Sequence, residues 1–239
     1  MITKFIKLRN KMKTLSIIIP VFNEEKTIKK VLESVLKQDI GNWKKEIIVI
    51  NDHSTDNTTQ VLKSFLDKIK ILQHGKNLGK GSALKTGFEA ATGDAIIIQD
   101  ADLEYDPNDW SKMIIELEKD ASLSAIFGSR EMSPKRKGYW HYVLGVRFLA
   151  FLINFLFKSN LTDPYTCYKL FRADLFKKIP LKSNGFEIEA EMTVKILKQR
   201  GKIKEVPINY YPRKFSEGKK IRFRDGLVGI WIIIKYWLK

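Results

Sequence analysis

Short apolar segments alternate with segments of helical periodicity through the first half of the chain. The apolar segments have the length of β-strands and cover residues 15–19, 46–50, 69–72, 95–99 and 124–127. Between them we predict helices over residues 24–37, after Ser54 or Thr55, over 82–91 and over 108–119. Strands that alternate with helices build βαβ units, so the sequence predicts an α/β fold with a mostly parallel sheet and helices on both faces.

The first predicted helix shows this periodicity most clearly. One face of it is apolar and consists of Ile28, Val31, Leu32, Val35 and Leu36. We predict Asn23 as its N-cap, with Glu24 and Glu25 in the first turn, where acidic side chains oppose the helix dipole.

Polar side chains collect where the predicted strands end. Residues 20–24 follow the first strand, Asn51 and Asp52 follow the second, and Asp100 and Asp102 follow a later one. In parallel sheets, ligands bind beyond the carboxyl ends of the strands. We therefore expect these side chains to lie along one edge of the sheet.

Asp100 and Asp102 stand two residues apart, directly after an apolar strand. Two carboxylates at such a position can converge on one hard cation, and Mg²⁺ takes oxygen ligands that it shares with substrate phosphates. The alternative is an ordinary turn, because Asp is common at strand ends and at N-caps. The first interpretation predicts a metal held against a diphosphate.

A glycine-rich segment, Gly75 to Gly81, lies before the third predicted helix. It is not a P-loop, because only three residues separate Gly75 from Gly79 and Gly81 stands where a Ser or Thr should bind the metal. A dinucleotide-binding fingerprint is also missing after the first strand. Gly79 and Lys80 still lead into a helix N-terminus, which suits a nucleotide phosphate or base edge.

The chain is strongly basic, with a formal net charge of +16 from 43 Lys and Arg against 27 Asp and Glu. Such a balance favours a polyanionic partner: nucleic acid, an anionic membrane surface or a phosphorylated substrate. The lone Cys167 excludes an intramolecular disulfide framework and a thiolate zinc cluster. We expect no cleavable signal peptide, because residues 1–13 lack an apolar core of the needed length.

Two apolar stretches, residues 143–157 and 226–238, bear on membrane contact. Both are short for a spanning helix, which needs about 20 apolar residues. We predict interfacial helices, with buried core helices as the alternative. The second stretch favours the headgroup region because it carries Trp231, Tyr236 and Trp237 beside Lys235 and Lys239.

Several short motifs occur in order along the chain. They are Pro20–Glu24 (PVFNE), Asn51–Asp56 (NDHSTD), Asn77–Gly81 (NLGKG), Asp100–Glu104 (DADLE) and Gly128–Arg130 (GSR). Together they resemble family 2 of the inverting glycosyltransferases, which share the GT-A fold. Later segments resemble the polyprenyl-phosphate (dolichyl-phosphate) hexose synthases: Asp163-Pro164, Cys167–Phe171, Phe186-Glu187, Val206-Pro207, and Arg213 with Lys219. The resemblance runs from about residue 15 to residue 220.

The resemblance implies a donor site for a nucleoside diphosphate sugar. The residues that would line the nucleoside pocket are Pro20, Phe22, Asn23 and Glu24, with Asp52 on the base. Asn51 departs from the Asp-Asp pair usual there, which puts the base contact in doubt. Asp100 and Asp102 would border the diphosphate and hold Mg²⁺ or Mn²⁺, with Glu104 as a third ligand or, alternatively, a solvated loop acid.

The resemblance also implies a phosphate acceptor, which is ionised near neutral pH and needs no dedicated base to attack the sugar. Bringing two anions together requires cations, and the candidates are Arg130, Arg147, Arg213 and Lys219. The alternatives are a snorkelling interfacial role for Arg147 and an ordinary surface role for Arg213. Hydroxyl acceptors need a catalytic acid near Glu187, Glu189 and Glu191, and we prefer Glu187 for its match to the Phe-Glu motif.

We therefore predict a peripheral enzyme at the cytoplasmic face of a membrane. It would transfer a hexose, with inversion, from GDP-mannose or UDP-glucose to polyprenyl phosphate, using Asp102 and Arg130 in catalysis and no nucleic acid. One alternative is a family 2 enzyme acting on a saccharide hydroxyl, and another is a non-catalytic module that binds anionic lipid or nucleic acid. The need for a membrane partner protein stays open.

The predicted organisation has three parts. Residues 1–13 form a basic extension, 14–220 the GT-A domain and 221–239 an amphipathic membrane-proximal helix. Residues 133–138 are a basic loop rich in helix breakers, which we interpret as a hinge between the nucleotide-binding half and the acceptor half.

Overall fold

The computed structural model describes residues 12–133, 140–213, 220 and 223–239. Most of the predicted basic extension, nearly all of the predicted hinge loop at 133–138, and Lys219 lie outside these residues.

The described residues form a seven-stranded sheet in the order β3-β2-β1-β4-β6-β5-β7. The strands are β1 (Thr14–Val21), β2 (Lys44–Asn51), β3 (Lys70–Gln73), β4 (Ala95–Ile98), β5 (Leu123–Ser129), β6 (Lys169–Arg172) and β7 (Lys202–Pro207). Neighbouring strands pair in parallel except at β6, which runs antiparallel between β4 and β5. The predicted mostly parallel α/β sheet is confirmed.

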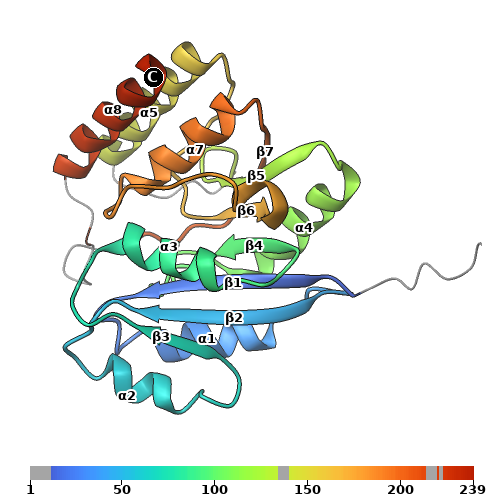
Figure 1. Cartoon of the computed structure of the whole chain (residues 1–239), viewed down its shortest axis with the longest axis vertical. Coiled ribbons are helices and arrows are strands. Elements are labelled where there is room, and N and C mark those ends of the chain that lie inside the picture. The colour runs from blue at the N-terminus through green and yellow to red at the C-terminus, as the bar shows by residue number, and fades with distance from the viewer. Residues whose placement is uncertain (1–11, 134–139, 214–219, 221–222) are drawn as a thin grey trace, which may run out of the picture.

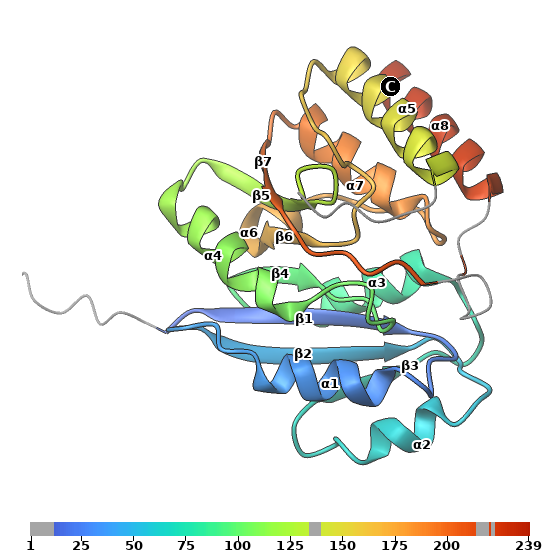
Figure 2. The same cartoon turned by 180° about the vertical axis from the view of Figure 1, so that it is seen from behind.

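Helices cover both faces of this sheet, and Figures 1 and 2 show α1 and α3 on opposite faces. The helices are α1 (Ile28–Lys37), α2 (Thr58–Lys63), α3 (Lys80–Ala90), α4 (Trp110–Lys119), α5 (Trp140–Phe157), α6 (Ala173–Phe176), α7 (Ile188–Lys198) and α8 (Phe223–Leu238), with a short 3-10 turn at Pro107–Asp109. Alternate residues of one strand supply the two cores: Ile17 and Ile19 face α1, α2 and α4, whereas Ile18 faces α3, α6 and α7.

The first helix begins later than predicted. Its N-cap is Thr27, so Glu24 and Glu25 lie before the first turn, and the prediction of Asn23 as the cap is wrong. Asn23 adopts a positive φ of 50° and is tied to the loop after β2, where its backbone N–H donates to Ser54 and its side-chain oxygen accepts the N–H of Thr55. These bonds fix the bend of the chain between β1 and α1, which positions Glu24 at the sheet edge.

A third layer lies at one end of the molecule, where α5 and α8 run side by side over α7 (Figure 1). Its own small core includes Leu149 and Ile153 of α5, Val194 of α7, and Ile232 and Ile233 of α8. The opposite faces of α5 and α8 stay exposed. Within the described chain, every helix is too short or too polar to cross a membrane.

Candidate active site

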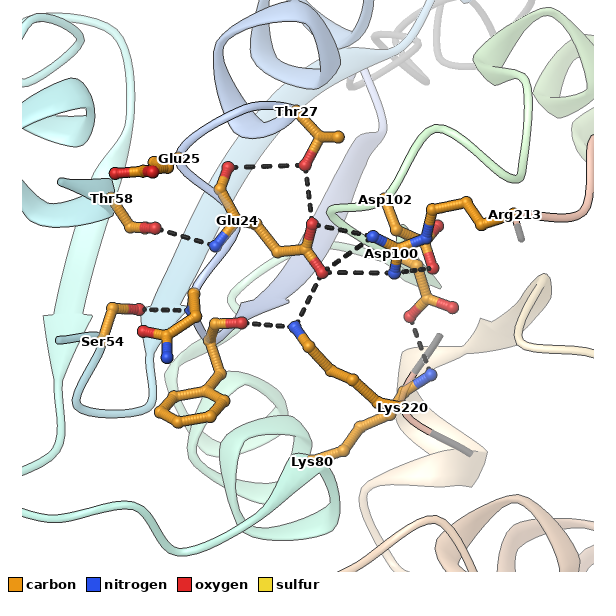
Figure 3. A network of polar contacts seen from close by, with 12 residues as sticks. Glu24, Glu25, Thr27, Ser54, Thr58, Lys80, Asp100, Asp102, Arg213 and Lys220 are labelled. Carbon is orange, nitrogen blue, oxygen red and sulfur yellow. Dashed lines mark hydrogen bonds and ion pairs between the residues drawn. The ribbon is translucent and has the colours of Figure 1, made fainter. Parts of the chain in front are cut away.

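Three acidic side chains from two separate segments meet at the carboxyl edge of the sheet (Figure 3). Glu24 follows β1, whereas Asp100 and Asp102 follow β4, which pairs in parallel with β1. Arg213 joins two of the acids: its guanidinium donates to the Glu24 carboxylate at 3.0–3.2 Å and to Asp102 Oδ2 at 2.9 Å. The predicted convergence on one edge is therefore present.

Asp100 has an internal counter-ion. Lys80, the first residue of α3, places Nζ 2.7 Å from Asp100 Oδ1 and 3.1 Å from the sulfur of Cys167. Burial alone would raise the pKa of Asp100, but the Lys80 charge and the hydrogen bonds from Lys80 and Cys167 together outweigh burial and leave that pKa below its ordinary value. Asp100 is therefore ionised as it stands.

Asp102 behaves differently, although it lies two residues away. Burial and the negative charges of Asp100 and Glu104 raise the pKa of Asp102 to about 7, against the opposing effect of Arg213. Among the described residues, Arg213 thus only partly offsets the negative charge around Asp102. Carboxylate oxygens whose negative charge is not fully neutralised suit a hard divalent cation, so Asp100 and Asp102 fit Mg²⁺ or Mn²⁺.

Glu104 does not join them as a third ligand. Its carboxylate accepts hydrogen bonds from the backbone N–H of Arg213 at 2.7 Å and from the Tyr210 hydroxyl at 3.0 Å. Its backbone carbonyl accepts the N–H of Tyr211, so both the side chain and the backbone of Glu104 bond to the segment after β7. Across the parts of the chain that the structure describes, three or more His, Cys, Asp or Glu residues are nowhere grouped to hold a metal ion.

The carboxylate of Asp52 is bound to the glycine-rich segment. The side chain is buried, and its carboxylate accepts the N–H groups of Leu78 at 2.9 Å and Gly79 at 2.8 Å. His74 Nδ1 lies 2.6 Å from the same carboxylate. The prediction of Asp52 as a base ligand is not supported by these contacts, which use both oxygens to fix the turn that presents Lys80.

The N-terminus of α3 is also already occupied. Gly79 has a φ of 92°, and a Cβ there would lie 2.5 Å from the carbonyl oxygen of Asn184. The same oxygen accepts the N–H groups of Gly81 at 2.7 Å and Ser82 at 3.2 Å. These amides are thus unavailable to a phosphate, which corrects the predicted role of this helix end. Gly79 is needed for the close packing of α3 on the loop before α7.

The remaining residues predicted for the nucleoside pocket lie along the end of β1. Pro20 pairs with Ile50 of β2, and the carbonyl of Phe22 accepts a hydrogen bond from Lys220. Lys220 Nζ also lies 2.7 Å from Glu24 Oε1 and 5.7 Å from the centre of the Phe22 ring. The sequence pattern pointed to Lys219, which lies outside the described residues, and missed its neighbour Lys220.

Arg130 and Arg147, both predicted as acceptor-side cations, have acidic partners of their own. Arg130 forms a bidentate ion pair with the fully buried Asp163, with both N–O distances at 2.7 Å. Arg147 donates to Glu131 at 3.0 Å, and its side chain is 58% exposed. These contacts give Arg130 a structural role and leave its predicted catalytic role untested.

The three acids near α7 occupy three different environments. Glu187 accepts the N–H groups of Asn184 and Gly185. Glu191 is held by Lys195 at 2.6 Å, and its pKa falls to about 2 because hydrogen bonds from Lys195 and Ser183 outweigh the effect of burial. Glu189 faces Lys80, so the acid nearest to the Asp100 end of the site is Glu189 and not the preferred Glu187.

Lys169 is a site residue that the sequence reasoning did not identify. It is fully buried in β6 and forms an ion pair with Glu189 at 2.5 Å. A lysine inside the apolar segment Cys167–Phe171 was the available signal, because a charge in a buried strand requires a partner.

Residues 16–180 match the family model described as glycosyl transferase family 2. The uncharacterized protein MJ1222 of Methanocaldococcus jannaschii is 30% identical over 229 residues, which are 92% of this chain and 89% of that protein. The low-salt glycan biosynthesis hexosyltransferase Agl6 of Haloferax volcanii is 29% identical over 94% of this chain. The glycosyltransferase AglD of the same organism is 28% identical over 93%. The chain spans 53% of Agl6 and 37% of AglD.

A solved structure of similar fold is that of glucosyl-3-phosphoglycerate synthase from Mycobacterium tuberculosis in complex with Mn²⁺, UDP and phosphoglyceric acid. It superposes with a TM-score of 0.73 at 18% identity and covers 94% of this chain and 78% of the synthase. At this identity the likeness establishes the fold.

Proposed function

Since this chain belongs to glycosyltransferase family 2 and is a glycosyltransferase, we propose that it transfers a hexose, with inversion, from a nucleoside diphosphate sugar to a polyprenyl phosphate. The observation that carries the proposal is the meeting of Asp100 and Asp102 with two internal cations, Lys80 and Arg213, at the carboxyl edge of the sheet. Hexose transfer is further supported by the similarity to Agl6, which is a hexosyltransferase of glycan biosynthesis.

The donor side of the proposal rests on the two acids after β4. Asp100 and Asp102 would hold Mg²⁺ or Mn²⁺, which when bound supplies Lewis-acid neutralisation of the departing diphosphate. Arg213 ties Asp102 to Glu24 and so aligns the loop after β4 with the end of β1. The M. tuberculosis synthase was solved with Mn²⁺ and UDP, which supports the use of a metal and a nucleotide.

The acceptor side rests on the contacts of the three acids at the start of α7, each of which is already engaged by another group. Glu189 and Glu191 are each paired with a lysine, and Glu187 accepts two backbone N–H groups. A hydroxyl acceptor needs a carboxylate to remove its proton, whereas an ionised phosphate oxygen attacks without one. These contacts favour the phosphate acceptor over a saccharide hydroxyl.

A lipid acceptor also requires the enzyme to reach a membrane, and we propose that α5 and α8 rest on its cytoplasmic face. Their outer surfaces expose large apolar side chains: Leu144, Phe148, Phe151, Phe155, Leu227, Val228, Trp231, Ile234, Trp237 and Leu238. One face of α8 packs on α5 and α7, as the buried-core alternative requires, and its other face is exposed, which supports the interfacial prediction. A patch of this kind favours an interface with lipid.

Replacing Trp231 and Trp237 by Gln should weaken binding to anionic vesicles by about tenfold, because both half-exposed indoles would otherwise leave water. Co-sedimentation with phosphatidylglycerol vesicles at low and high salt measures the loss. Leu66→Gln is the matched control, since Leu66 is 61% exposed on a different part of the molecule. Equal sedimentation of the double variant and the wild type would contradict a membrane role for α8.

The proposed reaction is tested by incubating the protein with Mn²⁺ and either GDP-mannose or UDP-glucose. A short polyprenyl phosphate or an oligosaccharide serves as the acceptor, and mass spectrometry identifies the product. We expect a polyprenyl-phosphate hexose with inverted anomeric configuration. Transfer to the oligosaccharide alone would establish the hydroxyl-acceptor alternative and overturn the proposal.

A further inference from the structure

Lys80 contacts two carboxylates, those of Asp100 and Glu189. Its Nζ is 2.7 Å from Asp100 Oδ1 and 3.5 Å from Glu189 Oε1. The side chain of Lys80 is 11% exposed and that of Glu189 is 4% exposed, so the contact is shielded from water. Lys80 is hydrogen-bonded to Asp100 and held near Glu189 without a hydrogen bond.

Glu189 has one oxygen satisfied and one free. Oε2 pairs with the buried Lys169 at 2.5 Å, whereas Oε1 is buried without a hydrogen-bond partner. A buried acceptor without a hydrogen-bond donor destabilises the protein. A carboxylate kept in this state has room for one more donor, and the nearest cation is Lys80.

A divalent cation at Asp100 would compete with Lys80 for the same carboxylate. Two positive charges within a few ångströms of each other repel strongly in a poorly hydrated site, so Lys80 must then leave Asp100. A buried ammonium group that leaves one acid needs another acid. Glu189 Oε1 satisfies that need with a small movement of Nζ.

We propose that Glu189 is a positioning residue that receives Lys80 when a divalent cation binds Asp100. The hydrogen bond from Lys80 Nζ passes from Asp100 Oδ1 to Glu189 Oε1, and Lys169 keeps Glu189 in place throughout. We call this movement of Lys80 from Asp100 to Glu189 the hand-over, and it rests on the metal use proposed above. The hand-over explains why the buried pair of Lys169 and Glu189 lies beside the site. It also lowers the free-energy cost of moving Lys80 away from Asp100.

Arg213 shows the same arrangement at the second acid. Its guanidinium bonds Asp102 once and Glu24 three times, so Glu24 retains Arg213 if Asp102 is taken by a cation. Each candidate metal ligand therefore has an internal cation that is shared with a second acid. The repetition indicates a property of the whole site and not an accident at Lys80.

Mn²⁺ binding in a double-mutant cycle tests the hand-over. Free Mn²⁺ is measured by electron paramagnetic resonance, with Mn²⁺ alone, for the wild type, Glu189→Gln, Lys80→Met and the double variant. We expect Glu189→Gln to weaken Mn²⁺ binding by about ten- to one-hundredfold, because Lys80 then loses its second acid. In the Lys80→Met background the same change should alter the affinity by less than about twofold.

If Glu189 acted only as a nearby negative charge, Glu189→Gln would weaken Mn²⁺ binding equally in the wild type and in Lys80→Met. Equal effects in these two backgrounds would therefore overturn the proposal. Glu46→Gln, at the opposite edge of the sheet, is the control for net charge. If Glu189→Gln does not fold because Lys169 is stranded, the cycle is repeated with Lys169→Met in all four proteins. Failure of the wild type to bind Mn²⁺ would overturn the proposed metal use as well, whereas additive effects would overturn the hand-over alone.

Discussion

Replacing Asp102 by Asn is expected to lower hexose transfer by about a thousandfold, the largest effect of any single change that we foresee. Asp102 is one of two acids proposed to neutralise, through a metal, the charge of the departing diphosphate. Such neutralisation contributes several kcal/mol to catalysis, and each 1.36 kcal/mol is about a tenfold change in rate. Steady-state kinetics with the donor varied measures the loss.

The fold should survive this substitution. Asn is nearly isosteric, and burial with the charges of Asp100 and Glu104 disfavours the ionised Asp102 in the native state. We expect the free energy of unfolding to change by less than about 1 kcal/mol. Asp106→Asn, in the same loop, is the control, because that side chain only caps the turn at residues 107–109 and Asn can also cap. Unchanged metal-dependent nucleotide binding in Asp102→Asn would remove Asp102 from the metal site.

Replacing Arg130 by Ala is expected to reduce the free energy of unfolding by about 3 kcal/mol. The change leaves Asp163 fully buried without its cation, and only the backbone N–H of residue 130 continues to donate to it at 3.0 Å. We place the loss at the lower end of the range for a broken buried pair because a fifth of the Arg130 side chain is exposed. Urea denaturation followed by circular dichroism measures it.

Arg147→Ala is the matched control for Arg130→Ala. The Arg147 side chain is 58% exposed, so removal of its ion pair with Glu131 should cost less than about 1 kcal/mol. A stable Arg130→Ala protein with a raised KM for polyprenyl phosphate would reverse our interpretation and return Arg130 to the acceptor site. Loss of stability in Arg130→Ala alone would establish the pair with Asp163 as structural.

The sheet and the edge that carries the site were predictable from the sequence for one physical reason. Apolar strand segments separated by helices leave few arrangements, and parallel strands place the residues after β1 and β4 at the same edge. Glu24, Asp100 and Asp102 meet there as expected. The strands β6 and β7 were not predicted, and β6 enters the sheet antiparallel between β4 and β5.

The sequence by itself thus determined the fold class, the family and the position of the acidic edge, because these follow from periodicity and from motifs that are local in the chain. Only the tertiary structure decided which partner each charged side chain has. The Asp52 carboxylate accepts the amide N–H groups of Leu78 and Gly79. Arg130 forms an ion pair with Asp163, and Lys80 forms ion pairs with Asp100 and Glu189. These partners are 20 to 109 residues apart in the sequence. A charge buried away from water must pair with an opposite charge or a hydrogen-bond donor, which no local pattern encodes.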